Sequence, residues 1–463
     1  MSNVLPWPSP DPDPHITPEE ADQKHTSHLR IAYRLAHTYE NRLLHVHGIG
    51  WHAWDGQRWA EDPSSGAAYR ALAEILREAW PAAQTDKELK ADIEKSQSAA
   101  GMAGVLAIAS RLETFDATVD HLDQDHNLLN TQNGTIELDT LTLRPADPKD
   151  RITKVCGGNY YPDAHSTNWD TYLERVLPDP ETRAFLQRYT GLGLLGKVRE
   201  HALAILTGTG RNGKGVFYGA VATALGDYAI TAEPDLFMAR EGAHPTGEMD
   251  LRGIRWVVVS ESEQGRRLAE ASVKRLTGGD VIKARRMRQD FVQFAPSHTA
   301  VLVTNHLPKV RGDDPAIWAR LRVVPFDVVI PKEEQDPDLS DKLDEDADAV
   351  LAWAVRGWVA YQEQGLAEPE AVRVATADYH ADSDPVTRFV NDACLTGAGY
   401  QASVSDIWDA WSMWRLDEGA EELSKRAFGE ALDRRGYATR RGTGGRRMRV
   451  GLGLTSDQDE DRW

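Results

Sequence analysis

Residues 204–219, AILTGTGRNGKGVFYG, limit the possible folds more than any other stretch of the sequence. An apolar run typical of a strand precedes four glycines and a lysine, and a run typical of a helix follows. In this order, backbone N–H groups of the loop and of the first helical turn converge on phosphate oxygens. We therefore predict a nucleotide-phosphate loop, to which the following residues contribute: Gly208, Thr209, Gly210, Arg211, Asn212, Gly213, Lys214, Gly215 and Val216.

The cofactors expected at this loop are ATP and Mg²⁺. Lys214 would neutralise the β- and γ-phosphates. Gly215 stands where such loops usually carry Ser or Thr, whose hydroxyl is a ligand of Mg²⁺. A water can replace that hydroxyl at some cost in affinity, because Mg²⁺ keeps several waters in any case. We expect nucleotide binding to persist and to depend more heavily on nearby acids.

Those acids are expected at the end of a neighbouring strand. RWVVVSESEQG has three consecutive valines before Glu261 and Glu263. Glu261 is the first choice for binding the metal through water and polarising the attacking water, and Glu263 is the second. The structural alternative is that both acids only cap the next helix. AVLVTN ends in Asn305, whose amide would position the hydrolytic water at the same sheet edge.

Two arginines flank a junction between a helix and a strand in DDPAIWARLRVVPF. An arginine that reaches the γ-phosphate of a neighbouring subunit would make hydrolysis depend on assembly. Arg320 is the candidate for this role. A structural ion pair is the favoured alternative for Arg322.

The chain of 463 residues suggests two to four domains. We predict an α/β protein with a mostly parallel sheet over 198–340, because short apolar strands alternate there with helices. The other predicted parts are a disordered leader (1–25), a mainly helical domain with small hairpins (26–197), a segment of helices and linker (341–384), and a winged helix-turn-helix (385–463). The linker itself is expected at residues 381–385. A helical stretch is expected over about 168–191, and Ile136, Leu138, Leu141 and Leu143 are expected on one side of a hairpin that turns at Asn133-Gly134.

Composition favours an intracellular, cytoplasmic protein. The only two cysteines, Cys156 and Cys394, are far apart and form neither a disulfide framework nor a zinc-ligand pair. No run of 18 apolar residues is present, so no membrane partner is expected. The first residues lack the basic and apolar regions of a secretory signal.

The net charge of −19 argues against a uniformly basic nucleic-acid coat, but it hides two local excesses of positive charge. Residues 251–322 carry fourteen Lys and Arg against seven Asp and Glu, and residues 425–450 carry nine against two. In the second segment a hairpin is predicted whose tip presents Arg440, Arg441, Arg446 and Arg447 to duplex DNA. The alternatives are a solvated charged face and a protein-contact module.

The motifs together resemble the superfamily 3 helicases of the AAA+ class, and more closely the ATPase half of phage and plasmid primase-helicases related to the poxvirus primase-helicase. GTGRNGKGVF resembles their Walker A, VVVSESEQG their Walker B, LVTNHLPKV their sensor 1 and IWARLRVVPF their arginine-finger segment. The resemblance spans about residues 30–365. It implies an AAA+ P-loop core. Gly215 and Ala319, which stands where many members show a second arginine, depart from the pattern.

The resemblance also implies a hairpin that holds single-stranded DNA in the channel of a ring. DVIKAR and DFVQFAP are strand-like arms around a basic tip, which independently suggests such a hairpin. Its DNA-binding candidates are Lys283, Arg285, Arg286 and Arg288. An exposed charged hairpin without a ligand is the alternative.

The favoured function is an ATP-dependent DNA helicase that moves on single-stranded DNA in phage, plasmid or prophage replication. It is expected to be a homo-oligomer, with a hexamer as the predicted form. The resemblance implies 3′ to 5′ travel. The alternative is an ATP-switched protein that binds duplex origin DNA or loads other proteins without separating strands. Priming is rejected for this chain alone, because no D-x-D on an apolar strand precedes residue 200. A separate primase or polymerase is the expected partner.

Overall fold

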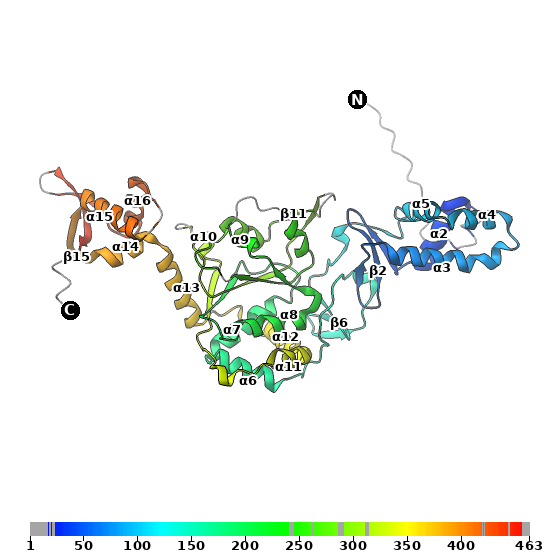
Figure 1. Ribbon diagram of the computed structural model, residues 1–463, viewed down its shortest axis with the longest axis horizontal. Coiled ribbons are helices and arrows are strands. Elements are labelled where there is room, and N and C mark those ends of the chain that lie inside the picture. The colour runs from blue at the N-terminus through cyan, green and yellow to red at the C-terminus, as the bar shows by residue number, and fades with distance from the viewer. Residues whose placement is uncertain are drawn as a thin grey trace, which may run out of the picture.

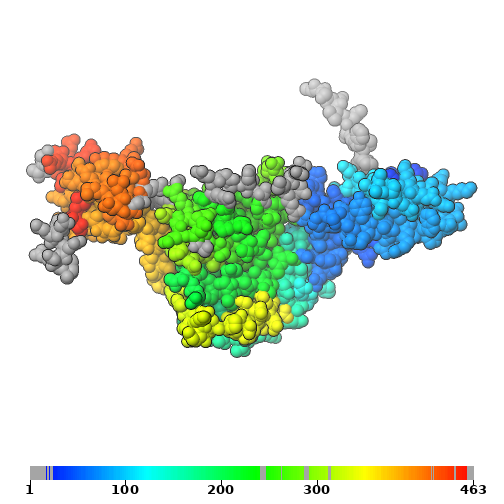
Figure 2. Space-filling model, viewed as in Figure 1, coloured from blue at the N-terminus to red at the C-terminus, as the bar shows by residue number. Residues whose placement is uncertain are grey.

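The computed structural model describes residues 17, 20, 24–239, 245–261, 263–285, 291–310, 314–418, 420, 422–442 and 445–455. In Figure 1, three bodies lie in a row: a helical body from the first part of the chain, a central body built on a sheet, and a small body from the last part. The central body is the largest of the three in the space-filling view (Figure 2). The leader predicted over 1–25 lies almost wholly outside the described residues.

The central sheet has five strands, all paired in parallel. Their spatial order is β14-β8-β13-β10-β9. The strands are β8 (Leu203–Thr207), β9 (Ala229–Ala232), β10 (Trp256–Glu261), β13 (Thr299–Thr304) and β14 (Leu321–Pro325). The predicted mixed α/β architecture with a parallel sheet is confirmed.

Both faces of this sheet are buried, which explains its continuous apolar strands. Val257, Val258 and Val259 are each fully buried. Val258 belongs to one hydrophobic core, while Val257 and Val259 belong to another, because successive side chains point to opposite faces. Figure 1 shows α7, α8 and α12 on the first face, and α9 and α10 on the second.

The helices of the central body are bounded as follows: α6 (Thr167–Val176), α7 (Pro180–Leu192), α8 (Lys214–Leu225), α9 (Glu270–Leu276), α10 (Pro315–Trp318), α11 (Leu339–Glu345), α12 (Ala347–Gln364) and α13 (Glu370–Ser383). Short 3-10 turns are η1 (Val119–His121), η2 (Pro148–Asp150), η3 (Gly226–Tyr228), η4 (Pro234–Leu236), η5 (Pro245–Leu251) and η6 (Lys332–Glu334).

Two predicted segments differ from the structure in detail. The helix expected over 168–191 is broken at Leu177-Pro178-Asp179, because Asp179 caps α7 by accepting a hydrogen bond from the Thr182 N–H (3.0 Å). The linker expected at 381–385 is helical up to Ser383, and Asp384 then caps α14 through the N–H groups of Val386 and Thr387 (both 3.1 Å).

The first body has a helical core of its own, formed by α2 (Ser27–Tyr39), α3 (Gly66–Ala83), α4 (Lys87–Ser96) and α5 (Ala99–Ala109). A small sheet of order β3-β2-β1-β4 adjoins it. Its strands are β1 (Leu43–Val46), β2 (Gly50–Trp54), β3 (Trp59–Glu61) and β4 (Asp116–Ala117).

The segment from Leu128 to Leu195 shares a hydrophobic core with the central sheet rather than with α2–α5, so the predicted unit 26–197 contains parts of two cores. It includes β5 (Leu128–Thr131), β6 (Gly134–Glu137) and β7 (Thr142–Arg144). The apolar side predicted for this hairpin is only half right. Ile136 and Leu138 are fully buried, but Leu143 is exposed and Leu141 is half-buried with a φ of 57°.

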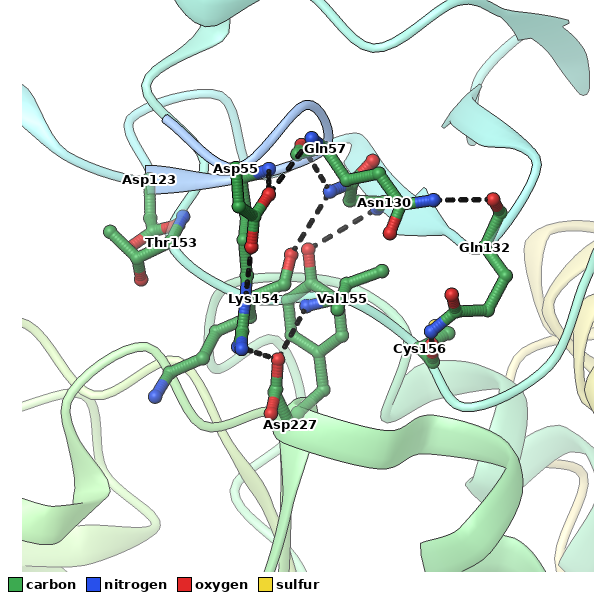
Figure 3. Close-up of polar contacts among 12 residues, drawn as sticks. Asp55, Gln57, Asp123, Asn130, Gln132, Thr153, Lys154, Val155, Cys156 and Asp227 are labelled. Carbon is green, nitrogen blue, oxygen red and sulfur yellow. Dashed lines mark hydrogen bonds and ion pairs between the residues drawn. The ribbon is translucent and has the colours of Figure 1, made fainter. Parts of the chain in front are cut away.

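A polar network joins the first body to the end of α8 (Figure 3). Asp227, just after α8, pairs with Arg58 from the β2–β3 turn and accepts a hydrogen bond from the Val155 N–H (3.2 Å). Nearby, the buried Asn130 side chain donates to the Gln57 carbonyl oxygen (2.8 Å). The helix that begins with Lys214 is therefore anchored at its far end.

The last body comprises α14 (Pro385–Ala393), β15 (Cys394–Ser403), α15 (Val404–Asp417), α16 (Lys425–Arg434), β16 (Thr439–Arg441) and β17 (Arg447–Leu454). Its antiparallel sheet has the order β15-β17-β16. Phe389, Trp411 and Phe428 fill its core. The two helices and the hairpin expected from the sequence are present, whereas α14 and β15 were not anticipated. The winged-helix assignment stays a prediction.

Cys156 and Cys394 are free and buried. Burial raises the pKa of each thiol to about 12. Within the described ranges, no helix is both long enough and apolar enough to cross a bilayer.

Candidate functional site

The loop between β8 and α8 packs so closely that two of its glycines have no room for a side chain. A Cβ on Gly208 would lie 2.3 Å from the Phe326 carbonyl oxygen, and one on Gly213 would lie 2.6 Å from Val176 Cγ1. Gly213 also has a φ of 84°, which favours glycine. These positions hold the loop against the end of β14 and against α6.

Lys214 is the first residue of α8, and its side chain is buried. Its Nζ donates to the Gly208 carbonyl oxygen (2.8 Å), to Asn212 Oδ1 (3.0 Å) and to Asn305 Oδ1 (3.2 Å). Burial lowers the pKa of Lys214. Two of the predicted site residues, 91 positions apart in the sequence, are thus in direct contact.

Asn212, which accepts a hydrogen bond from Lys214, is itself held in place by the protein. Its side chain is buried, and Nδ2 donates to the Phe326 carbonyl oxygen (2.9 Å). The Tyr172 hydroxyl on α6 donates to the Gly213 carbonyl oxygen (2.8 Å). Neither Tyr172 nor Phe326 was expected at this site, because no local pattern links them to the loop.

The remaining loop residues form its open face. Thr209, Arg211 and Gly215 are exposed, while Gly210 and Val216 are half-buried. A Cβ on Gly215 would meet no atom within 4 Å. Packing therefore does not require glycine at 215, and a hydroxyl side chain would fit there.

Glu261 ends β10 and is only 5% exposed. Its Oε1 accepts a hydrogen bond from the Glu263 N–H (2.8 Å). Its Oε2 has no hydrogen-bond partner among the described residues and lies 3.8 Å from Arg266 Nε, which is too long for a hydrogen bond. Burying a carboxylate oxygen without a hydrogen-bond partner costs free energy and is rare in folded proteins. This oxygen is therefore free to accept a hydrogen bond from a water or a ligand.

Glu263 is exposed, and its carboxylate lies 3.1 Å from Arg266 Nη1. Arg266 also hydrogen-bonds to Asp235 Oδ1 (3.2 Å). These acids raise the pKa of Arg266. Arg266 was not expected at this site, although its position three residues after Glu263 is a local signal for an ion pair.

The strand register places these groups at one edge of the sheet. Glu261 pairs with Thr304, and Thr304 pairs with Thr207. Since the strands are parallel, Glu261, Asn305 and the phosphate loop all lie at the carboxyl edge, where open α/β sheets bind ligands. A cleft of about 620 Å³ opens there, lined by Thr207, Gln264, Gly265, Asn305, His306, Leu307 and Lys309.

Arg320 does not join this cluster in its own chain. It immediately precedes β14, and its carbonyl oxygen accepts from the Leu203 N–H at the amino end of β8. Its Nη1 donates to the Ala316 carbonyl oxygen (2.6 Å). Arg322 pairs with Glu368, the structural alternative considered for it.

The hairpin predicted from DVIKAR (280–285) and DFVQFAP (290–296) has antiparallel arms, β11 (Ile282–Ala284) and β12 (Val292–Phe294). Lys283 and Arg285 are exposed on its outer face. Arg286 and Arg288 lie outside the described residues.

The arginines predicted for the last body lie on or beside the hairpin of β16 and β17. All four are exposed: Arg440, Arg441, Arg446 and Arg447. Arg449, by contrast, is buried and bonds to Asp433 and to the Tyr437 carbonyl oxygen (2.6 Å), which is a structural role.

Among the described residues, no group of three or more His, Cys, Asp or Glu could hold a metal ion. At nucleotide sites Mg²⁺ generally takes most of its ligands from phosphates and water, so that one carboxylate oxygen able to bind a metal-bound water can suffice on the protein side. The open oxygen of Glu261 fits that requirement.

Comparison with known proteins finds similarity to viral proteins named as putative helicases and putative primases. The family model described as "D5 N terminal like" matches residues 32–178. "Putative helicase L207/L206" of Acanthamoeba polyphaga mimivirus is 23% identical over 84% of this chain and 45% of its own length. "Putative helicase 022R" of Frog virus 3 is 24% identical over 65% and 31%, and "Putative primase C962R" of African swine fever virus is 23% identical over 67% and 35%.

The chain thus spans less than half the length of these relatives. Among solved structures, the apo C-terminal region of NrS-1 has a TM-score of 0.39 and 11% sequence identity. The alignment covers 62% of this chain and 75% of the NrS-1 chain. A likeness that low carries no weight.

Proposed function

On the premise that the chain is a primase-helicase of the superfamily 3 type, as its family match and viral relatives support, we propose that it is an ATP-dependent DNA helicase that moves on single-stranded DNA. The relatives support a replication function of the helicase and primase kind. ATP hydrolysis and strand separation are the proposal.

The observation that carries the proposal is the direct contact of Lys214 with Asn305 beside the open carboxylate of Glu261. The lysine now satisfies three oxygens of the protein. In the proposed complex it exchanges them for phosphate oxygens, and the loop N–H groups bind the same phosphates. Asn305, released from the lysine, orients the attacking water, and Glu261 accepts a hydrogen bond from it.

Mg²⁺, when bound, would offset negative charge on the phosphates. Glu261 Oε2 would hold it through a water, with Glu263 as the second acid. Since Gly215 supplies no ligand, the metal would be bound more weakly than in loops with a hydroxyl.

Arg320 lies at the opposite edge of the sheet from its own loop, so it would serve the nucleotide of a neighbouring copy. That role requires a homo-oligomer, for which we propose a hexameric ring. The arginine hairpin of the last body, as a winged helix, would bind duplex origin DNA, and a separate primase or polymerase would complete the replication machinery.

Steady-state ATP turnover with and without single-stranded DNA tests the proposal. We expect DNA to stimulate turnover, and Lys214→Ala to lower it by about 10²- to 10³-fold, the usual cost of losing a charge that stabilises the transition state. Turnover that ignores DNA at low salt, or that survives Lys214→Ala, overturns the proposal.

A second function is favoured by one observation, the absence of a hydroxyl at Gly215. Slow hydrolysis would suit an ATP-switched loader that binds forked DNA without separating it. A strand-displacement assay distinguishes the two, because only the helicase releases the displaced strand.

A further inference from the structure

Phe291 is an exposed aromatic residue on the outer face of the β11–β12 hairpin, 49% accessible to solvent. Two cations of the facing arm lie over its ring. Lys283 Nζ is 5.1 Å from the ring centroid, and Arg285 Cζ is 4.6 Å from it.

The hairpin does not need this side chain for its own core. Ile282, Ala284, Val292 and Phe294 are buried and join the hydrophobic core of the central body. Alternation along the arms places Lys283, Arg285 and Gln293 on the exposed side with Phe291. One aromatic ring and two cations therefore lie together on the exposed face of the hairpin, while its other face is buried.

Such a surface is complementary to both the bases and the phosphates of a single strand of nucleic acid. An unpaired base offers a π face that stacks on an aromatic ring, and the adjoining phosphate offers a negative charge to the cations. Bases in a duplex are already stacked on one another, so their faces are not available.

We propose that Phe291 is a stacking platform for an unpaired base, with Lys283 and Arg285 contacting the flanking phosphates. The inference deepens the proposed function, since it rests on the hairpin being a single-strand site. It adds a contact that depends on the base but not on its identity, because every base has a π face.

The test measures binding of the full chain to two single strands of equal length, one of ordinary nucleotides and one abasic. Phe291→Ala should weaken binding to the ordinary strand by about 5- to 150-fold, the range for one stacked base. It should leave abasic binding and the salt dependence unchanged. Phe291→Trp should retain binding, and Phe291→Leu, which keeps apolar bulk without a π face, should lose most of it.

Arg285→Ala is the matched variant for the phosphate contact. It should weaken binding to both strands and reduce the slope of log K against log salt by about 0.7. Tyr161→Ala removes another exposed aromatic, 51% accessible, from outside the hairpin and should change neither strand. Thermal unfolding checks that each variant is folded.

Equal loss on both strands by Phe291→Ala, or no loss on the ordinary strand, overturns the inference alone. If the unaltered chain binds neither strand, the proposed function fails and the inference fails with it.

Discussion

The phosphate loop and the β11–β12 hairpin both carry basic residues beside strands of the central body, but they are held in opposite ways. Lys214 is buried and contacts three named oxygens at 2.8 to 3.2 Å. Lys283 and Arg285 are exposed, and the only ring they lie over is itself half-exposed. Of these two sites, only the phosphate loop holds its cation through several hydrogen bonds to protein oxygens.

This difference suits the two ligands proposed. A triphosphate has one shape, so donors that are already in place avoid the cost of reorganisation. A single strand varies in sequence and must be released repeatedly, so solvated cations and a ring that accepts any base are sufficient. We therefore expect a single substitution near the loop to cause a large loss of ATP turnover. A substitution on the hairpin should cause only a partial loss of DNA affinity.

The steepest effect is expected at Glu261. Glu261→Gln keeps the shape of the buried side chain but removes its charge, so ATP turnover should fall by about 10²- to 10³-fold while nucleotide binding persists. Turnover and binding of a fluorescent ATP analogue measure the two. Glu263→Gln is the matched change and should cost far less, since Glu263 is exposed; equal losses would assign the role to both acids.

The next effect concerns the stability of the fold around β13, the strand that precedes Asn305. His298 precedes this strand, is 3% exposed, and burial lowers its pKa to about 4 from 6.5. A histidine buried in its neutral form stabilises the fold fully above pH 6.5, and this contribution is lost as pH falls from 6.5 towards 4. One such group costs about 2 kcal/mol between pH 7 and pH 5.

Chemical denaturation at the two pH values measures this loss. His298→Phe has no proton to gain, so it should lose about 2 kcal/mol less than the unaltered chain over the same interval. Parallel losses would mean that the ring is already solvated in the folded protein.

A moderate effect is expected on the hairpin. Lys283→Ala combined with Arg285→Ala removes two phosphate contacts, so affinity for single-stranded DNA should fall by about tenfold near physiological salt. The slope of log K against log salt should flatten by about 1.4. Fluorescence anisotropy across a salt series measures both, and an unchanged slope would move the strand to another surface, such as the arginines of the last body.

The smallest effect, and the one change expected to improve the site, is at Gly215. Gly215→Ser fits without a clash and supplies the missing hydroxyl, so the Mg²⁺ concentration for half-maximal turnover should fall by about threefold. Gly215→Ala is the matched control, because it also raises helix propensity over glycine, by more than Ser does, without supplying a ligand. Identical metal dependence in the two variants would show that the hydroxyl is not a ligand here.

The sequence alone determined the parts of this protein that depend on local chemistry. Strand periodicity and glycine spacing located β8, the loop and α8, and the apolar runs located β10, which ends at Glu261, and β13, which ends just before Asn305. Ser424 caps α16 by accepting a hydrogen bond from the Ala427 N–H (3.2 Å), three residues along the chain. Such features involve residues a few positions apart, so their energies are decided within a short window.

The tertiary structure alone decided which distant groups meet. It brought Tyr172 and the Phe326 carbonyl to the loop, set Arg266 beside Glu261, and placed Arg320 at the far edge of the sheet. It also divided residues 26–197 between two cores and made helix where a linker was expected at 381–385. These outcomes depend on the order of parallel strands and on packing across the whole core, which no local pattern specifies.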